Sequence, residues 1–295
     1  MPELSPEFVP ADAIEHLRGS RSSPIGCPGL YVCGELKSLS AITVAIVGTR
    51  AASAQGRRCA HVLAADLGAR GITILSGLAL GIDAAAHEGA LSASGPTVAV
   101  LGGGHRRFFP ARNAGLCARI LAASGAVLSP YPPDRPAMPY QFLERNGVVA
   151  ALADAVVVVE APARSGALNT ASWAAGRIPV MAMPGDVERP SVAGCLALIR
   201  DGATLVRDAR DVLEELRIAT EPDQPRLPLA PLLDPLELVV WTTLTQGEAD
   251  FNHLIALTSI TAPQLLAALT RLELSGHIEQ RPGARYACTN LRSSL

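Results

Sequence analysis

The hydrophobic positions between residues 41 and 217 fall into two alternating kinds of segment. Short, nearly uninterrupted apolar runs predict strands at 43–47, 72–75, 97–101, 126–129, 155–160 and 179–183. Alanine- and leucine-rich stretches between them predict helices at 53–70, 82–92, 113–123, 142–151, 170–176, 191–200 and 208–216. Apolar strands joined by helices are typical of a parallel sheet buried on both faces. The pattern therefore predicts an α/β domain at 41–217 with a Rossmann-like, doubly wound parallel sheet.

The pattern changes after residue 217. Residues 218–234 are proline-rich and have neither a helical nor a strand period, which is typical of a linker. Helical patterns at 235–245, 251–258 and 262–275 then precede strand patterns at 277–281 and 285–288, which a Pro-Gly turn joins. These elements predict a small winged-helix domain over 235–295. Residues 1–40, with a short apolar run at 30–32, are too few for their own core, and we expect this N-terminal extension to pack on the central domain.

Composition narrows the class of protein. The chain has 295 residues, of which 49% are apolar and 18% charged, as expected for a globular protein of about two domains. No apolar run approaches the roughly 18 residues of a membrane span, and the first thirty residues lack a signal-peptide pattern. We therefore expect a cytoplasmic protein with no membrane partner. The six cysteines never form C-x-x-C, which favours neither a disulfide framework nor a zinc site.

Charge is distributed unevenly along the chain. Residues 41–200 hold 14 arginines against 9 acidic residues, whereas residues 218–295 hold 5 arginines against 8 acidic residues. A polyanion should therefore prefer the middle of the chain.

Loops of small residues follow the predicted strands, at 48–50, 76–81, 102–104, 164–167 and 184–185. In an open parallel sheet such loops share the carboxyl edge, where ligands bind. Helix N-termini there present unpaired N–H groups, and glycine lets a phosphate approach the main chain. One such loop is most simply a turn, but five on one edge predict a site for an anionic ligand.

Standard nucleotide and hydrolase motifs are missing. The first loop lacks G-x-G-x-x-G, and the P-loop pattern does not occur, since the only lysine is Lys37. Ser165 does not stand in G-x-S-x-G, and Asp83 with His87 is more typical of a solvated or capping pair than of a catalytic one. The sequence therefore favours a binding protein without cofactor or metal over an enzyme.

The groups expected near this edge suggest a nucleic-acid ligand. They are a guanidinium, several polar groups at two predicted helix starts, and an aromatic ring. Phosphate contacts combined with base stacking hold single strands without sequence preference. We expect Arg50 and Arg145 to neutralise phosphates and Phe142 to stack a base, although Phe142 alone would be interpreted as a core residue. The predicted single-stranded-DNA-binding residues are Gly48, Thr49, Arg50, Ser53, Ser76, Gly77, Leu78, Phe142, Arg145, Asn146, Ser165, Gly166, Asn169 and Thr170.

Seven short runs stand in the order and spacing of a known family. They are VAIVGTRAAS (44–53), ILSGLALGIDAAAHEGAL (74–91), AVLGGG (99–104) with FFPARN (108–113), LSPYPP (128–133), FLERN (142–146), VVVEAPARSGALNTA (157–171) and VMAMPGD (180–186). In these runs the chain resembles the DprA/Smf family, the DNA-processing proteins of bacterial transformation. The resemblance covers about residues 28–217, and the C-terminal module resembles the family's winged-helix extension.

The resemblance implies a homodimer that binds single-stranded DNA, protects incoming strands and loads the recombinase RecA onto them during natural transformation. It implies dimerisation through about residues 194–216, where we expect an apolar patch of Leu198, Ile199, Leu205, Val206 and Val212.

Three positions depart from the family pattern. Leu80 and Gly147 stand where arginine is common, and Arg106 stands where aspartate is common. We therefore expect Arg106, Arg107 and Arg112 to carry part of the DNA contact.

The alternative from another class is a nucleotide sensor or nucleotide-processing enzyme on the same fold, similar to phosphoribohydrolases of the LOG type. That family carries P-G-G-x-G-T-x-x-E in one loop, whereas residues 184–188 read PGDVE and lack the second and third glycines. The winged-helix module is acidic, and its third predicted helix offers only Arg271 beside Glu273. We expect this module to contact protein or support a dimer rather than to bind DNA.

Overall fold

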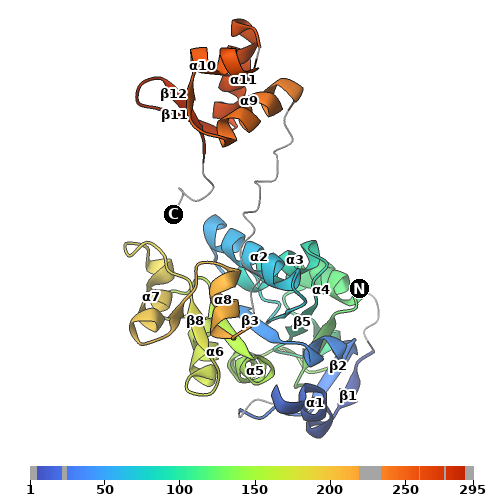
Figure 1. Ribbon diagram of the computed structural model, residues 1–295. Coiled ribbons are helices and arrows are strands. Elements are labelled where there is room, and N and C mark those ends of the chain that lie inside the picture. The colour runs from blue at the N-terminus through green and yellow to red at the C-terminus, as the bar shows by residue number, and fades with distance from the viewer. Residues whose placement is uncertain (1–4, 22–24, 219–233, 259, 276, 290–295) are drawn as a thin grey trace. The chain divides into compact units, whose positions relative to one another are not determined.

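The computed structural model of the chain describes residues 5–21, 25–218, 234–258, 260–275 and 277–289. The chain divides into two compact units, Met1–Thr220 and Glu221–Leu295 (Figure 1). Each unit has its own hydrophobic core. The predicted linker at 218–234 lies outside the described residues, apart from its first and last residue.

A large sheet forms the centre of the first unit. Within the described residues its strands are β1 (Glu7–Val9), β2 (Leu30–Gly34), β3 (Thr43–Val47), β4 (Thr73–Ser76), β5 (Thr97–Val100), β6 (Ala126–Ser129), β7 (Ala155–Val158), β8 (Val180–Ala182) and β9 (Thr204–Leu205). Their spatial order is β1-β2-β6-β5-β4-β3-β7-β8-β9. All pairs from β6 to β9 are parallel, whereas β2 pairs antiparallel with β6 and β1 antiparallel with β2. The predicted α/β class with a doubly wound parallel sheet is confirmed.

Helices cover both faces of this sheet. They are α1 (Ala11–Arg18), α2 (Ala54–Gly68), α3 (Ile82–Ser92), α4 (Ala114–Ala122), α5 (Pro139–Leu152), α6 (Gly166–Ala174), α7 (Ala193–Arg200) and α8 (Ala209–Glu215). Short 3₁₀ turns are η1 (Gly19–Arg21), η2 (Leu36–Ser40), η3 (His105–Arg107), η4 (Ala111–Asn113) and η5 (Pro190–Val192). In Figure 1, α2, α3 and α4 lie on one side of the strands, and α5 and α6 on the other.

Burial along the strands explains their apolar sequence. In β3, Ile46 packs in the cluster with α2, α3 and α8, while its neighbour Ala45 packs in the cluster with α1, α5 and α6. Successive strand side chains point to opposite faces, and both faces are covered, so all five positions of β3 are buried.

The N-terminal extension is part of the first unit's core. Strands β1 and β2 extend the sheet, and Ile14 of α1 packs in the main cluster. Arg18 is 3% exposed and donates to Leu152 O over 2.6 Å and to the Asp154 carboxylate over 3.1 Å. Burial lowers the pKa of Arg18, and the charge of Asp154 opposes that shift. A paired charge of this kind ties α1 to the end of α5, since removing one partner leaves the other buried without compensation.

Several boundaries and one surface differ from the sequence prediction. α5 begins at Pro139 rather than residue 142, and α6 begins at Gly166 rather than residue 170. Of the apolar patch expected at 194–216, Val206 and Val212 are wholly buried against α2, so this part of the prediction is wrong. Leu205, by contrast, is 42% exposed on β9, the edge strand of the sheet.

The second unit is a small helical domain with a short sheet. Its elements are α9 (Pro235–Thr245), β10 (Ala249–Asp250), α10 (Phe251–Thr258), α11 (Ala262–Leu274), β11 (Ile278–Arg281) and β12 (Arg285–Cys288). The sheet order is β10-β12-β11. In the parts of the chain that the structure describes, no single helix is long and apolar enough to span a membrane.

Candidate functional site

A pocket opens where the strand order of the large sheet reverses. From β3 the chain proceeds outward through β4, β5 and β6, and then returns to β7 on the other side of β3. The loops after β3 and β7 diverge at such a point, which is where open parallel sheets bind ligands. The pocket has a volume of about 760 Å³, within the usual range of ligand sites.

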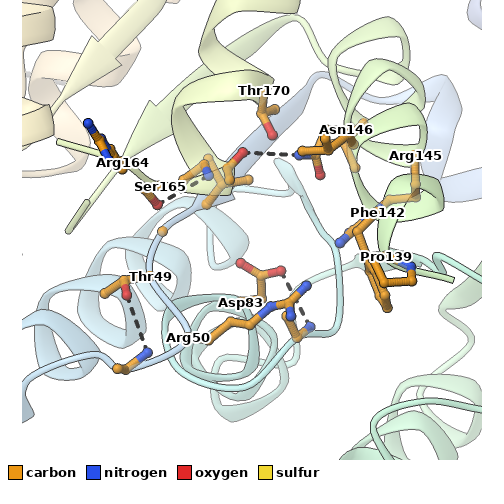
Figure 2. Close-up of a pocket in the computed structure, with 18 of the residues that line it drawn as sticks. Thr49, Arg50, Asp83, Pro139, Phe142, Arg145, Asn146, Arg164, Ser165 and Thr170 are labelled. Atoms are coloured by element: carbon orange, nitrogen blue, oxygen red, sulfur yellow. Dashed lines mark hydrogen bonds between the residues drawn. The ribbon is translucent and has the colours of Figure 1, made fainter. Parts of the chain in front are cut away.

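Side chains from four parts of the fold face one another across this pocket: the loop after β3, the start of α3, the start of α5 and the start of α6 (Figure 2). The lining comprises Val47, Gly48, Thr49, Arg50, Ala51, Ala79, Asp83, Phe109, Ala137, Pro139, Phe142, Leu143, Arg145, Asn146, Val149, Pro162, Arg164, Ser165, Gly166, Ala167 and Thr170.

Glu160, two residues after β7, fixes the loop after β3. Its carbonyl accepts from Thr49 N over 2.7 Å, and its carboxylate accepts from the backbone N and the hydroxyl of Ser53 over 3.0 and 2.9 Å. The Ser53 hydroxyl also accepts from Gly56 N over 2.9 Å and so caps α2. Ser53 therefore holds the loop in place and does not line the pocket.

Arg50 leads from this fixed loop to an aromatic ring. Its side chain is exposed, and Cζ lies 4.8 Å from the centroid of the Phe142 ring, within cation–π range. Phe109 meets the same ring edge-on, at a centroid distance of 5.9 Å. Phe142 is thus a half-buried ring at the pocket wall rather than a core residue.

Buried side chains and hydrogen bonds fix the loop after β4. Ser76 is fully buried and donates its hydroxyl to Ile46 O over 2.6 Å. Leu78 has a left-handed backbone (φ 53°) and a fully buried side chain. The carboxylate of Asp83 accepts from Gly77 N over 3.2 Å and from Ala79 N over 3.4 Å. The side chains of Ser76 and Leu78 therefore point into the protein, and the hydrogen bonds of Asp83 fix the course of the loop.

Arg145 lines the pocket but is almost wholly buried. It is 4% exposed and donates Nη1 to Val100 O over 3.1 Å. Burial lowers its pKa, while the negative charge of Asp83 opposes that shift. A Cβ at Gly77 would stand 1.5 Å from the Arg145 Nη1, so the guanidinium occupies the space that this glycine leaves free.

Asp83 and His87 do not form the solvated or capping pair that their spacing suggests, because both are buried. His87 Nδ1 lies 2.7 Å from Thr97 Oγ1, and burial lowers the pKa of His87 to about 3. Burial raises the pKa of Asp83, and the nearby Arg145 guanidinium opposes that shift.

The start of α6 supplies polar groups opposite Arg50. Ser165 caps the helix by accepting from Ala167 N over 3.3 Å, which leaves the helix N-terminus facing the pocket. Asn146 Nδ2 donates to Gly166 O over 3.0 Å and to Asn169 Oδ1 over 3.3 Å, so it joins α5 to α6.

The charge balance of the pocket is positive. Its ionisable lining residues are Asp83 and the three arginines Arg50, Arg145 and Arg164. Together with the N-terminus of α6, these cations favour an anionic ligand. The aromatic wall at Phe142 adds a surface on which a planar group can stack.

The structure brings together most, but not all, of the predicted site residues. Gly48, Thr49, Arg50, Phe142, Arg145, Asn146, Ser165, Gly166 and Thr170 line the pocket, whereas Ser53, Ser76, Gly77, Leu78 and Asn169 stand behind it. Arg106 is exposed and pairs with Asp134 over 3.0 Å, and Arg112 is exposed on η4; neither lines the pocket. Their roles in DNA contact stay predictions.

The other twelve lining residues were not predicted as site residues, and Arg164 and Leu143 are two of them. Arg164 opens one of the predicted loops, so its position was a usable signal. Leu143 is 50% exposed beside Phe142, but a leucine in an apolar helix gives no such signal.

Comparison with known proteins gives consistent matches. The family model described as DNA recombination-mediator protein A matches residues 16–217, and the DprA winged helix domain matches residues 222–284. A Mycobacterium tuberculosis chain named as a DNA processing protein DprA is 42% identical over 276 residues, covering 90% of this chain and 70% of that one.

Two solved structures are also similar. DNA processing protein A from Streptococcus pneumoniae has a TM-score of 0.63 at 33% identity, covering 72% of this chain and 75% of that one. DNA processing protein A from Helicobacter pylori, described for its single-stranded-DNA-binding mode, has a TM-score of 0.61 at 27% identity, covering 73% of this chain and 96% of that one.

Proposed function

Because this chain belongs to the DprA/Smf family of DNA recombination mediators, we propose that it binds single-stranded DNA in the pocket between β3 and β7 and acts by binding rather than by catalysis. The single-stranded-DNA binding for which the Helicobacter pylori relative is described supports the choice of ligand.

The observation that carries the proposal is Arg50 lying over Phe142 at the mouth of a positively charged pocket. Arg50 is exposed, so its guanidinium is free to turn from the ring towards a phosphate when a base takes its place on Phe142. Backbone N–H groups at the start of α6 receive a second phosphate. Arg145 lines the pocket while being almost wholly buried, and it acts on the ligand through its charge.

We further propose that the protein is a cytoplasmic homodimer that presents two DNA sites to the recombinase RecA in natural transformation. Strand β9 stands at one end of the strand order and carries the exposed Leu205, and the unpaired backbone groups of an edge strand can pair symmetrically with a second copy. Two linked sites raise the apparent affinity for one long strand without any new contact.

The winged-helix unit is proposed to play a supporting role. Each arginine that the structure describes in this unit is paired with acidic residues: Arg271 with Asp234 and Glu237, and both Arg281 and Arg285 with Glu248. Guanidiniums neutralised in this way have little charge left for phosphates.

Calorimetry tests the proposal against the nucleotide-sensor alternative. The full chain is titrated with a short oligothymidylate and, in matched salt, with each mononucleotide. Saturable binding of the oligonucleotide with no heat from mononucleotides supports the proposed function. A mononucleotide that binds as tightly as the oligonucleotide contradicts it and supports the sensor.

A further inference from the structure

Exposed apolar side chains continue from the pocket along α5 and α6. Leu143 on α5 lines the pocket and is 50% exposed, and Trp173 on α6 is 40% exposed, one turn beyond Thr170, which also lines the pocket. An exposed tryptophan next to a binding site is unusual, because tryptophan is highly buried on average.

The Trp173 ring lies flat over Gly147. A Cβ built at Gly147 would meet Cε2, Cδ2 and Cζ2 of the ring at 3.1, 3.3 and 3.4 Å. Cδ2 and Cε2 are the two atoms that the five- and six-membered rings share, so this approach is onto the ring face and not its edge. One face of the indole is therefore supported by the α5 backbone, and the exposed part of the ring is turned away from it.

A cation stands in the turn that follows α6. Arg177 is exposed, and its Nη1 donates to the backbone carbonyl of Trp173 over 2.9 Å, which holds the guanidinium at the C-terminal end of α6, next to the residue that carries the indole. The nearest acidic residue on α5, Glu144, accepts a hydrogen bond from the Tyr131 hydroxyl over 2.7 Å. The surface thus combines an aromatic ring with a neighbouring positive charge, the pairing that single-strand-binding grooves use.

We propose that Trp173 is a second base-stacking site, which takes a nucleobase of the same DNA strand that occupies the pocket. This inference rests on the proposed function. Phe142 and Gly147 are five residues apart, so they are separated by about 7.5 Å along the α5 axis and by roughly 140° around it. Leu143 lines the pocket and stands one helical turn before Gly147, on the same face of α5. A strand that leaves Phe142 would therefore reach Trp173 by passing over Leu143, with Arg177 as a cation for a following phosphate.

The proposal also gives a role to a departure from the family pattern. Position 147 is one where the resemblance leads us to expect arginine, and here it is glycine. Without a side chain at 147 the indole can lie against α5, so an aromatic surface stands where a charge was expected.

Intrinsic fluorescence tests the stacking directly, because the chain has only two tryptophans, Trp173 and Trp241, and the second belongs to the winged-helix unit. In the full-length Trp241→Phe variant, Trp173 is the sole reporter. Titration with oligothymidylate is expected to quench its emission along the same curve as the anisotropy of labelled oligonucleotide. The matched control, Trp173→Phe, retains Trp241 and is expected to show no quenching.

Affinity supplies the second readout. Trp173→Ala is expected to weaken oligothymidylate binding by about 5- to 150-fold, the range measured for losing one stacked base, and Trp173→Phe to retain most of the affinity. If Trp173→Ala fails to fold, the quenching in the Trp241→Phe variant decides the question.

The two proposals fail in different ways. If the oligonucleotide binds with an affinity that depends on Arg50 while the emission of Trp173 stays constant and Trp173→Ala binds like the parent, the second stacking site is refuted and the proposed function stands. If no oligonucleotide binds at all, both are refuted.

Discussion

Replacing Arg50 by alanine removes one phosphate partner while leaving the pocket framework intact. Glu160 holds the loop through Thr49 and Ser53, independently of the Arg50 side chain. In the free protein the substitution removes the exposed cation–π pair with Phe142, which is worth about 0.5–1 kcal/mol. The variant should therefore fold, with an unfolding free energy lowered by no more than that amount.

Arg50→Ala is expected to change how strongly the affinity for DNA depends on salt. Each phosphate neutralised on a single strand contributes about 0.7 to the slope of log affinity against log salt. Removing one phosphate partner should flatten the slope by ~0.7, so raising salt fourfold, from about 50 to 200 mM, should weaken the parent roughly 2.6-fold more than the variant. Anisotropy of a labelled oligothymidylate measures both slopes.

Arg119→Ala is the matched control, because Arg119 is an exposed arginine on α4 that does not line the pocket. It makes the same change in net charge and should leave the slope unaltered. The reasoning is refuted if Arg50→Ala retains the slope and affinity of the parent, or if Arg119→Ala changes them equally.

Three further outcomes are expected. Burial lowers the pKa of His87 to about 3 in the folded protein, against about 6.5 in the unfolded chain. Only the unfolded chain therefore takes up this proton, so His87 should contribute a fall in unfolding free energy of ~1.4 kcal/mol per pH unit as the pH drops from about 6 to 4. Urea unfolding at several pH values gives the unfolding free energy as a function of pH, and its slope against pH should be smaller in His87→Gln by that amount. An equal slope in the variant and the parent contradicts the buried, neutral state of His87. A variant that lacks residues 219–295 should retain most of the affinity for single-stranded DNA. An isolated 230–295 fragment that binds as tightly as the full chain would show that the DNA site lies in the second unit. Sedimentation at micromolar concentration should give a dimer mass, which Leu205→Glu lowers; a monomer with intact DNA binding rules out the dimer.

The sheet was predictable because its strands are buried on both faces. The five residues of β3 are all apolar or β-branched and all buried, and the four from Val44 to Val47 pack alternately in the two core clusters. Strand β1 at one edge of the sheet was not predictable, since two of its three residues are exposed, the third is partly buried, and they show no alternation to detect. The start of α5 was predicted three residues late, although Pro139 at its first position is a usual start signal.

The position of the site followed from the topology, but the orientation of its side chains did not. Parallel strands bring their loops to one edge, so Arg50, Phe142 and Ser165 could be grouped from sequence alone. Nothing in the sequence shows that Arg145 is buried, because its place depends on the space beside Gly77 and on the charge of Asp83, both of which arise only when the chain is folded.

A crystal structure of the full chain with a short oligothymidylate tests the location of the DNA site most directly. The expected result is a strand in the pocket between β3 and β7, with a base on Phe142, one phosphate within hydrogen-bond distance of the Arg50 guanidinium and another at the N-terminus of α6. A strand bound to the winged-helix unit, or on the sheet edge at β9, with the pocket empty, would contradict this location.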